Sequence, residues 1–293
     1  MAAITCGRYL PRIGGSMAQK SILITGCSSG IGHHVAHALK ARGWRVFATC
    51  RRAEDCTRLE SEGLESWVLD YEDTTSIRAG FDHAIERTGG TLDALYNNGA
   101  YAIPGAIEDM PTDAFRACFE TNFFGWHELT RLVVPVMRNQ GHGRIVQCSS
   151  ILGFCALRMR APYIATKHAL EGYTDVLRYE LHGSGIHAIL LEPGPIESKI
   201  RQNSRAHYER WIDPEASHWK GFYAKIVHPR LYAEDLPKDR FELGCEATTA
   251  KLIHALESPR PKARYFVTTP TYIVHWMKRL LPWSWVDAVL RRN

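Results

Sequence analysis

A tyrosine and a lysine stand four positions apart in Tyr163-Ile-Ala-Thr-Lys167. Because a helix repeats every 3.6 residues, this spacing places both side chains on one helix face. A free phenol has a pKa of about 10, and a nearby ammonium group lowers it by favouring the phenolate. Such a phenol can donate a proton to a carbonyl oxygen or take one from an alcohol. The alternative for this pair alone is a half-buried aromatic and a solvated lysine on an amphipathic helix.

Two polar side chains upstream extend this candidate set. Ser150 follows an apolar run ending at Cys148, and Asn122 lies in Thr-Asn-Phe-Phe-Gly125. A serine hydroxyl can donate a second hydrogen bond to an oxygen on which charge develops. Ser149 is its less favoured neighbour. Nothing in the sequence orients the histidines, which we interpret as surface or core residues, and we expect no metal site; they include His33, His34, His168 and His187.

A glycine-rich turn joins the first apolar run to a helical pattern. Its glycines would let the backbone approach a pyrophosphate, which the N-terminus of the following helix would favour. The spacing is G-x-x-x-G-x-G, and the alternative is a glycine-rich loop without a ligand. The expected cofactor-binding residues of this turn are Gly26, Ser28, Ser29, Gly30, Ile31 and Gly32.

The end of the second apolar run indicates which dinucleotide is bound. A carboxylate there would select NAD, whereas an arginine would pair with the 2′-phosphate of NADP. Arg51 and Arg52 stand at this position without an acidic residue, so we expect NADP(H). The alternative is that both arginines only cap a surface turn. Asp70, after the third run, is expected to bind the adenine amino group, with a helix N-cap as its alternative.

Apolar runs alternate with helical patterns along most of the chain, which predicts a parallel sheet covered by helices. No repeat or linker interrupts them, so we expect one doubly wound α/β domain over residues 17–269, of Rossmann type, with a seven-stranded, mostly parallel sheet. The expected helices include 30–41 and 163–181. The expected strands cover residues 21–25, 45–49, 67–70, 92–96, 143–148, 186–191 and, at an edge, 264–267.

Three segments stand apart from this alternation. Residues 1–16 precede a second methionine and are expected to be a poorly ordered leader. Residues 195–243 form an expected substrate-loop region, whose aromatics either line an apolar pocket or pack within the loop. Residues 270–293 form an amphipathic tail; we favour packing on its own domain or a neighbouring subunit over membrane contact. The loop aromatics are Trp211, Trp219, Phe222 and Tyr223.

Composition excludes several classes of protein. The chain has 293 residues, 45% of them hydrophobic and 23% charged, with a net charge of +5 that no basic block concentrates. These values are typical of a globular protein and do not indicate nucleic-acid binding. The eight cysteines form no C-x-x-C pair, which favours a reduced, cytoplasmic chain.

Taken together, these motifs resemble the short-chain dehydrogenase/reductase family, and within it the branch of 17β-hydroxysteroid and retinol dehydrogenases and bacterial NADP-dependent aldehyde reductases. The resemblance covers about residues 20–267. It implies that Tyr163 is the general acid/base and that Lys167 is its partner and anchors the cofactor ribose. It also implies that Ser150 orients the carbonyl and that Asn122 holds a water for proton relay.

The resemblance extends to two further cofactor-binding segments. Pro193, Gly194, Ile196 and Ser198 match the segment beside the nicotinamide, with serine where the family usually has threonine. After the fourth expected strand, the family's Asn-Asn-Ala-Gly appears as Asn97-Asn98-Gly99-Ala100. Both exchanged residues are small, so the backbone can still pass close to the adenosine ribose, although the exchange puts the usual cofactor affinity in doubt.

We therefore expect an NADP(H)-dependent oxidoreductase that interconverts an alcohol and a lipophilic ketone or aldehyde, a carbonyl reductase or its reverse. Two alternatives stay open: a non-redox enzyme of the same fold, such as an epimerase or dehydratase, and a catalytically inactive NADP(H)-sensing protein. We expect a small-molecule partner, no nucleic acid, and a homo-oligomer.

Overall fold

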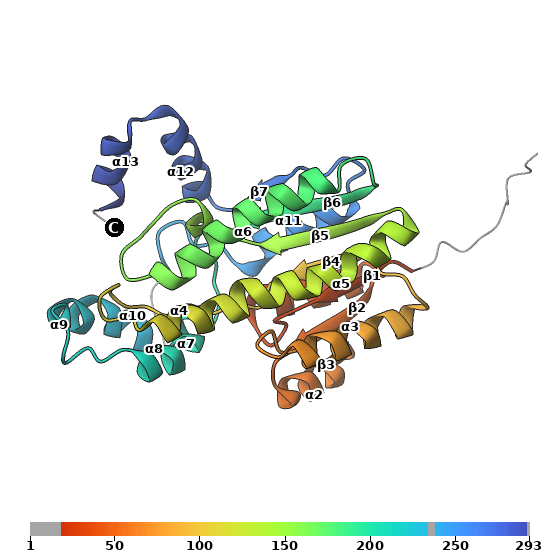
Figure 1. Ribbon diagram of the computed structural model, residues 1–293, viewed down its shortest axis with the longest axis horizontal. Helices are drawn as coiled ribbons and strands as arrows, with labels where there is room; N and C mark the ends of the chain where they lie inside the picture. Colours follow the sequence, from red (N-terminus) through yellow and green to blue (C-terminus); the bar gives the residue numbers. More distant parts are fainter. Residues whose placement is uncertain (1–18, 234–237, 292–293) are drawn as a thin grey trace, which may run out of the picture.

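A seven-stranded sheet forms the centre of the computed structural model, which describes residues 19–233 and 238–291 (Figure 1). The expected leader lies outside the described residues. All strand pairs are parallel, in the order β3-β2-β1-β4-β5-β6-β7. The strands are β1 (Ser21–Ile24), β2 (Arg45–Cys50), β3 (Glu65–Val68), β4 (Ala94–Asn97), β5 (Gly143–Cys148), β6 (Ile186–Glu192) and β7 (Arg264–Phe266).

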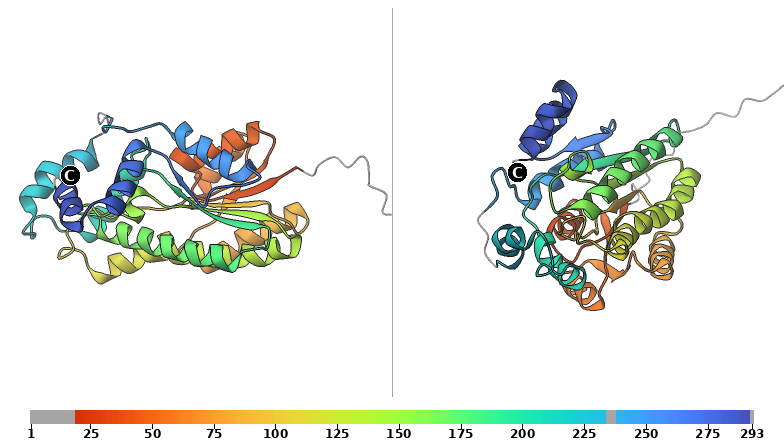
Figure 2. Two further views of the ribbon diagram at one scale, coloured as in Figure 1. Left: turned by 90° about the horizontal axis from the view of Figure 1, so that it is seen from above. Right: turned by 60° about the vertical axis from the view of Figure 1, so that its left-hand side comes forward.

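Helices cover both faces of this sheet, as Figure 2 shows from above. One face carries α1 (Gly30–Ala41), α2 (Ala53–Ser61) and α11 (Cys245–Glu257), and the other carries α3 (Thr74–Thr88), α5 (Gly125–Gln140) and α6 (Ala161–Glu180). Because both faces are covered, the central strands are apolar on both sides. Side chains such as Ile22, Leu23 and Ile24 on β1 are completely buried. The doubly wound Rossmann-type fold is confirmed.

The strand order reverses between β1 and β4, which lie side by side. In open α/β sheets, ligands bind at such a switch point, outside the carboxyl ends of the strands. The glycine-rich turn follows β1 there, and Asn98 follows β4. Ser150 comes two residues after β5. The topology therefore brings the predicted site residues to one edge of the sheet.

Strand boundaries differ slightly from those expected. The third strand covers Glu65–Val68 rather than 67–70, because its register pairs Phe47 with Glu65 and Cys50 with Val68. The fourth strand covers Ala94–Asn97 rather than 92–96. Such shifts of about two residues are ordinary, because hydrogen bonding to the neighbouring strand sets the ends of a strand.

The helical segment before β5 is interrupted. It consists of α4 (Thr112–Phe119), a π-helical turn η1 (Glu120–Phe124) and α5. A π-helical turn shifts the backbone hydrogen bonds to i→i+5 and is frequent at functional sites. The spacing of apolar residues cannot predict this π-helical turn, because the chain is α-helical on both sides of it. The turn contains Asn122, which is completely buried.

Two segments extend beyond the carboxyl ends of the strands (Figure 1). The described part of 195–243 is mostly helical rather than a plain loop. The other segment is the tail, in which Pro282 ends one helix and begins the next. The elements are α7 (Ile200–Asn203), α8 (Arg205–Trp211), α9 (Lys220–Phe222), η3 (Tyr223–Val227), α10 (His228–Tyr232), α12 (Thr269–Leu280) and α13 (Trp283–Leu290).

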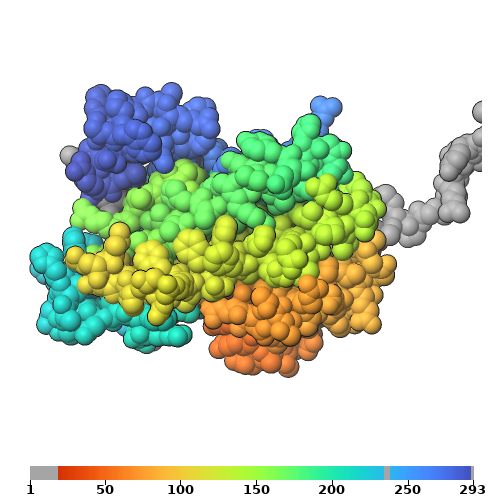
Figure 3. All heavy atoms as spheres, in the orientation of Figure 1, coloured from red at the N-terminus to blue at the C-terminus, as the bar shows by residue number. Residues whose placement is uncertain are grey.

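The two segments lie on either side of the chain that carries α4 and the start of α6, as the space-filling view shows in cyan and blue (Figure 3). They flank the end of the molecule at which the strands terminate. No helix in residues 19–233 or 238–291 has the length and apolar character needed to span a bilayer.

Candidate active site

Tyr163 and Lys167 lie in the first two turns of α6, as their spacing predicts. Tyr163 is partly exposed, whereas Lys167 is 1% exposed. The Lys167 ammonium nitrogen lies 5.5 Å from the centroid of the Tyr163 ring and donates a hydrogen bond of 2.7 Å to the carbonyl oxygen of Cys148. A charged side chain is therefore buried directly beneath the phenol.

Burial has the largest effect on the pKa of both Tyr163 and Lys167. Burial raises the pKa of the Tyr163 phenol, although a hydrogen bond with Ser150 acts in the opposite direction. Burial lowers the pKa of Lys167 to about 8. Desolvation of the phenolate outweighs that hydrogen bond, and the expected lowering of this pKa by the ammonium group together with the positive nicotinamide of the oxidised cofactor stays a prediction. The phenol consequently keeps its proton at neutral pH.

The neighbouring serines after β5 have different partners. Ser150 precedes the short 3-10 helix η2 (Ile151–Gly153), and its hydroxyl oxygen accepts a hydrogen bond from the Leu152 amide. It is also the serine that contributes to the pKa of Tyr163. Ser149 instead donates to the carboxylate of Glu171. The structure thus brings Ser150, not Ser149, to the phenol.

Asn122 lies behind this group and is fixed by both ends of its amide. Its Oδ1 accepts from the Tyr101 amide at 3.1 Å, and its Nδ2 donates to the Tyr101 carbonyl at 2.8 Å. Nδ2 also reaches the hydroxyl of Thr166 on α6 at 3.4 Å. The side chain therefore joins the π-helical turn to the helix that carries Tyr163 and Lys167.

Trp126 is a site residue that sequence reasoning missed. The Lys167 ammonium group lies 4.2 Å from the centroid of its ring, and the indole Nε1 donates to the Gly99 carbonyl at 2.9 Å. An aromatic face stabilises a desolvated cation. Trp126 stands four residues after Asn122, and this spacing on a helix could have indicated that it belongs to the site. Tryptophans on a helix, however, are far more often ordinary core residues.

Close backbone contacts explain the glycines of the turn after β1. Gly26 has a φ of +67°, and a Cβ there would come within 2.5 Å of the Gly99 Cα. A Cβ on Gly32 would come within 2.4 Å of the Gly26 carbonyl oxygen. Ser29, the N-cap of α1, makes no side-chain capping bond, so the turn presents a helix N-terminus that suits a phosphate. Ser28 lies in the same turn and Ile31 in the first turn of α1, and both are partly buried.

The segments after β4 and β6 reach this turn. Asn98 donates from Nδ2 to the carbonyl oxygens of Thr25 and Gly26, at 3.1 and 3.2 Å. Asn97 points the other way: it is completely buried, and its amide bonds Tyr71, Thr130 and Gln147. Gly99 lies against Gly26, so the exchanged Asn-Asn-Gly-Ala order keeps a close backbone approach.

The segment after β6 crosses from the serine loop to the phosphate turn. The Pro193 carbonyl accepts from the Ile151 amide at 2.8 Å, and a Cβ on Gly194 would collide with the Thr268 hydroxyl at 2.0 Å. Ile196 forms an isolated bridge with Leu243. Ser198 lies against Gly30, with its Cβ 3.4 Å from where a Cβ on that glycine would stand.

The two arginines after β2 have different surroundings. Arg52 pairs with Asp55 at 2.9 Å and with Glu54 at 3.3 Å. Arg51 is exposed and makes no ion pair within the described part of the chain. Asp70 accepts from the Glu72 amide at 3.1 Å, and the N-cap of α3 is Asp73, so a helix cap is not the role of Asp70.

Comparison with known proteins accords with this geometry. Residues 20–209 match the family model of the short chain dehydrogenases. The chain belongs to the short-chain dehydrogenase family. It is therefore an oxidoreductase that acts on an alcohol or carbonyl group.

Three similar proteins illustrate the range of this family. The uncharacterized oxidoreductase YbbO of Escherichia coli is 37% identical over 94% of this chain and 96% of its own length. Human 17-beta-hydroxysteroid dehydrogenase type 1 is 29% identical over 86% of this chain and 78% of its own. The structure of an actinorhodin polyketide ketoreductase with NADPH superimposes with a TM-score of 0.69, is 27% identical, and covers 85% of this chain and 95% of its own.

An apolar cluster packs against the ring of Tyr163 in this short-chain dehydrogenase. Val274 and Met277 of α12 and Leu290 of α13 pack against Leu152 and the neighbourhood of Tyr163. Part of the tail thus packs on its own domain, and the preference for such packing over membrane contact stays a prediction. Which face of the tail points inward could not be predicted, because apolar residues occur around both of its helices.

The aromatics of the 195–243 region form a second cluster with Tyr101, Ile103 and Met110. Tyr223 is completely buried, and its hydroxyl donates to Asp109 at 2.7 Å. The indole of Trp219 donates to Glu108 at 2.7 Å. The polar atoms of these two aromatics are therefore bonded to the segment before α4, and the lining of an apolar substrate pocket stays a prediction.

Proposed function

We propose that this protein is an NADP(H)-dependent oxidoreductase that interconverts an alcohol and a lipophilic ketone or aldehyde. The proposed catalytic residues are Asn122, Ser150, Tyr163 and Lys167. The observation that carries the proposal is the burial of the Lys167 ammonium group beneath a partly exposed phenol. Burying a cation is costly, so a site that does so is a candidate for function rather than for stability.

The residues at the switch point fit a dinucleotide. The turn from Gly26 to Gly32 would hold the pyrophosphate, since Gly26 and Gly32 leave no room for a Cβ and Gly30 has a φ of +58°. Lys167 would bind the nicotinamide ribose, and the segment 193–198 would lie along the nicotinamide. A bound nicotinamide supplies or accepts the hydride of the reaction.

The chain's own residues would handle the proton and the developing charge. Tyr163 holds its proton at neutral pH, because burial raises its pKa, and would donate it to the carbonyl oxygen during reduction. Ser150 would donate a second hydrogen bond to the same oxygen. Asn122 would support a water that returns a proton to the site. In the reverse direction, Tyr163 would accept the alcohol proton.

Arg51 supports the preference for NADP(H). No carboxylate stands at the end of β2 to accept from a ribose 2′-hydroxyl. Arg51 has no ion-pair partner within the described residues and is free to bind a 2′-phosphate, whereas Arg52 is paired with two carboxylates. Arg51 is therefore the proposed principal contact to the 2′-phosphate of NADP(H).

The apolar cluster behind Tyr163 supports a lipophilic substrate. Apolar side chains of α12 and α13 pack with Leu152 and Tyr163 and would form one wall beside the phenol. An apolar wall favours substrates whose non-reacting part is hydrocarbon. The similarity to a steroid dehydrogenase agrees with this class without selecting one compound.

A panel of carbonyl compounds, assayed with NADPH and NADH, tests the proposal through the absorbance of the reduced nicotinamide. We expect oxidation of NADPH with a lipophilic ketone or aldehyde. Substrate consumption without net change in the cofactor would indicate a non-redox enzyme. Tight NADPH binding with no turnover of any compound would indicate a binding protein.

A further inference from the structure

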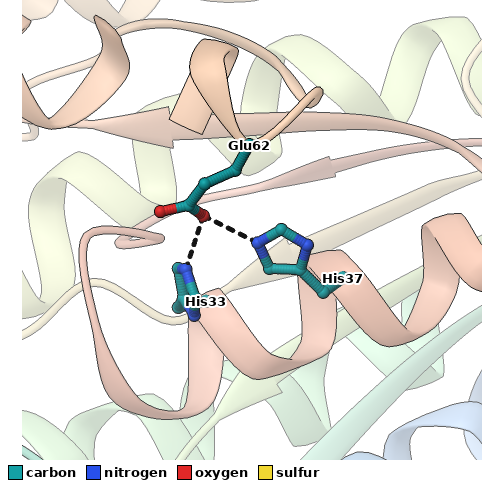
Figure 4. Close-up of side chains that lie close together, drawn as sticks. All are labelled: His33, His37 and Glu62. Atoms are coloured by element: carbon teal, nitrogen blue, oxygen red, sulfur yellow. Dashed lines mark hydrogen bonds and ion pairs between the residues drawn. The ribbon is translucent and has the colours of Figure 1, made fainter. Parts of the chain in front are cut away.

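Two histidines on α1 and one glutamate after α2 converge on a single point of the surface (Figure 4). His33 and His37 stand four residues apart, so both imidazoles project from the same face of the helix. Their Nε2 atoms lie 2.7 Å and 2.8 Å from the same carboxylate oxygen, Oε2 of Glu62. Within residues 19–233 and 238–291, no other group of histidine, cysteine and acidic side chains gathers in this way.

The second oxygen of the Glu62 carboxylate is also hydrogen-bonded. Nη1 of Arg58 donates to Oε1 of Glu62 at 2.6 Å, which leaves Oε2 facing the imidazoles. An outer hydrogen bond that fixes a carboxylate ligand is a common support of metal sites.

The helix that presents the histidines is rigidly anchored. Val35, Ala36 and Leu39 of α1 are completely buried against the sheet, so the opposite face stays at the surface. The side chains of His33 and His37 are 34% and 37% exposed. The site is therefore preorganised by the fold and open to an ion from solvent.

We propose that His33, His37 and Glu62 bind one divalent transition-metal ion of the zinc class, with water completing the coordination. Two imidazoles and one carboxylate form a ligand set used for Zn²⁺, whereas Mg²⁺ and Ca²⁺ prefer oxygen ligands alone. The ion would enter between the three ligand atoms and replace their present hydrogen bonds. Both imidazoles must be neutral for this, so binding releases any protons that they carry.

The position of the site gives the ion a structural role. His33 directly follows Gly32 of the phosphate turn, and Nη2 of Arg58 donates to the Ser28 carbonyl of that turn at 2.6 Å. A metal bound here would fasten the start of α1 to the end of α2. It would therefore brace the turn on which the proposed dinucleotide site depends, without taking part in catalysis.

The test is a titration of the full-length, chelator-treated protein with Zn²⁺ by calorimetry and with Co²⁺ by visible absorption. We expect one equivalent of each metal, binding at least tenfold more weakly in His37→Gln and in Glu62→Gln. Neither Mg²⁺ nor Ca²⁺ should displace Co²⁺.

His34→Gln is the matched control. His34 lies between the two proposed ligands in sequence but bonds the Thr249 hydroxyl at 2.7 Å, so its loss should leave metal affinity unchanged. Circular dichroism with chelator present should show the wild-type fold in all three variants. Equal metal affinity in the wild type and in both His37→Gln and Glu62→Gln would overturn the proposal, as would an equal loss in His34→Gln.

Discussion

The ammonium nitrogen of Lys167 lies 5.5 Å from the centroid of the Tyr163 ring, yet burial keeps the pKa of the phenol above its usual value. The same burial lowers the pKa of the lysine to about 8. Both groups are therefore biased toward their neutral forms in the protein without a cofactor. A phenol that retains its proton is suited to donating it to a carbonyl oxygen.

Lys167→Met should stabilise the fold at neutral pH while abolishing activity. A lysine whose pKa falls from 10.5 to about 8 on folding disfavours the folded state by about 3 kcal/mol below pH 8. Loss of the hydrogen bond to Cys148 and of the cation–π contact with Trp126 offsets about 2 kcal/mol of that gain. We expect a net gain of about 1 kcal/mol at pH 7 in urea unfolding.

The pH dependence of the stability difference between Lys167→Met and the wild type tests the sign of this effect. The penalty is fully present below the folded pKa and vanishes above the unfolded pKa, so the advantage of Lys167→Met should shrink from pH 8 to about pH 10.5. A variant that is less stable than wild type at pH 7 would mean that the buried ammonium group is stabilising.

Ser150→Ala and Ser149→Ala should have opposite signatures. Loss of one donor to the developing oxyanion lowers kcat by about 100- to 1000-fold, which we expect for Ser150→Ala. Ser149 instead donates to Glu171, so its replacement should cost about 1 kcal/mol of stability with kcat within a few-fold of wild type. Steady-state kinetics and urea unfolding of both variants test this prediction. A larger loss of kcat in Ser149→Ala than in Ser150→Ala would mean that Ser149, not Ser150, donates to the substrate oxygen.

Arg51→Asp should shift the cofactor preference. Removing a charge-assisted contact to the 2′-phosphate and adding repulsion should lower kcat/KM for NADPH by about 100-fold, with little effect on NADH. Arg52→Asp is the matched control, since that guanidinium already pairs with Asp55 and Glu54. Equal losses with both cofactors in Arg51→Asp would remove the basis for NADP(H) selection.

Met277→Ala should weaken the use of long-chain carbonyl substrates. Met277 packs with the cluster beside Tyr163, and each buried methylene contributes about 0.8 kcal/mol. We expect KM for lipophilic carbonyls to rise about three- to tenfold, with smaller effects on short-chain compounds. Ile273→Ala, on the same helix but 54% exposed, is the control. Equal changes in KM for short-chain and long-chain substrates would mean that the apolar cluster around Met277 does not contact the substrate.

Features set by short stretches of chain could be predicted from the sequence. The glycine turn and the Tyr163–Lys167 pair depend on local geometry, and the alternation of runs gave the sheet and its seven strands. The resemblance to the short-chain dehydrogenase family added Ser150 and Asn122 as candidates. The strand ends shifted, because pairing with a neighbour rather than local composition determines where a strand stops.

Features that depend on distant partners could not be predicted. Asn97 and Asn98 are adjacent and identical in type, yet one is buried in a hydrogen-bonded core and the other binds the turn after β1. His33 and His37 had no visible partner, because Glu62 reaches them only after α2 folds against α1. The raised pKa of Tyr163 likewise depends on tertiary burial.

The most direct test of the account is Tyr163→Phe, measured by kcat with a lipophilic carbonyl compound and by NADPH affinity in a binding assay. The variant removes only the hydroxyl, so we expect kcat to fall by at least about 100-fold with the Kd for NADPH within a few-fold of wild type. If Tyr163→Phe reduces the carbonyl at close to the wild-type rate, the phenol is not the proton donor and the proposed mechanism is contradicted.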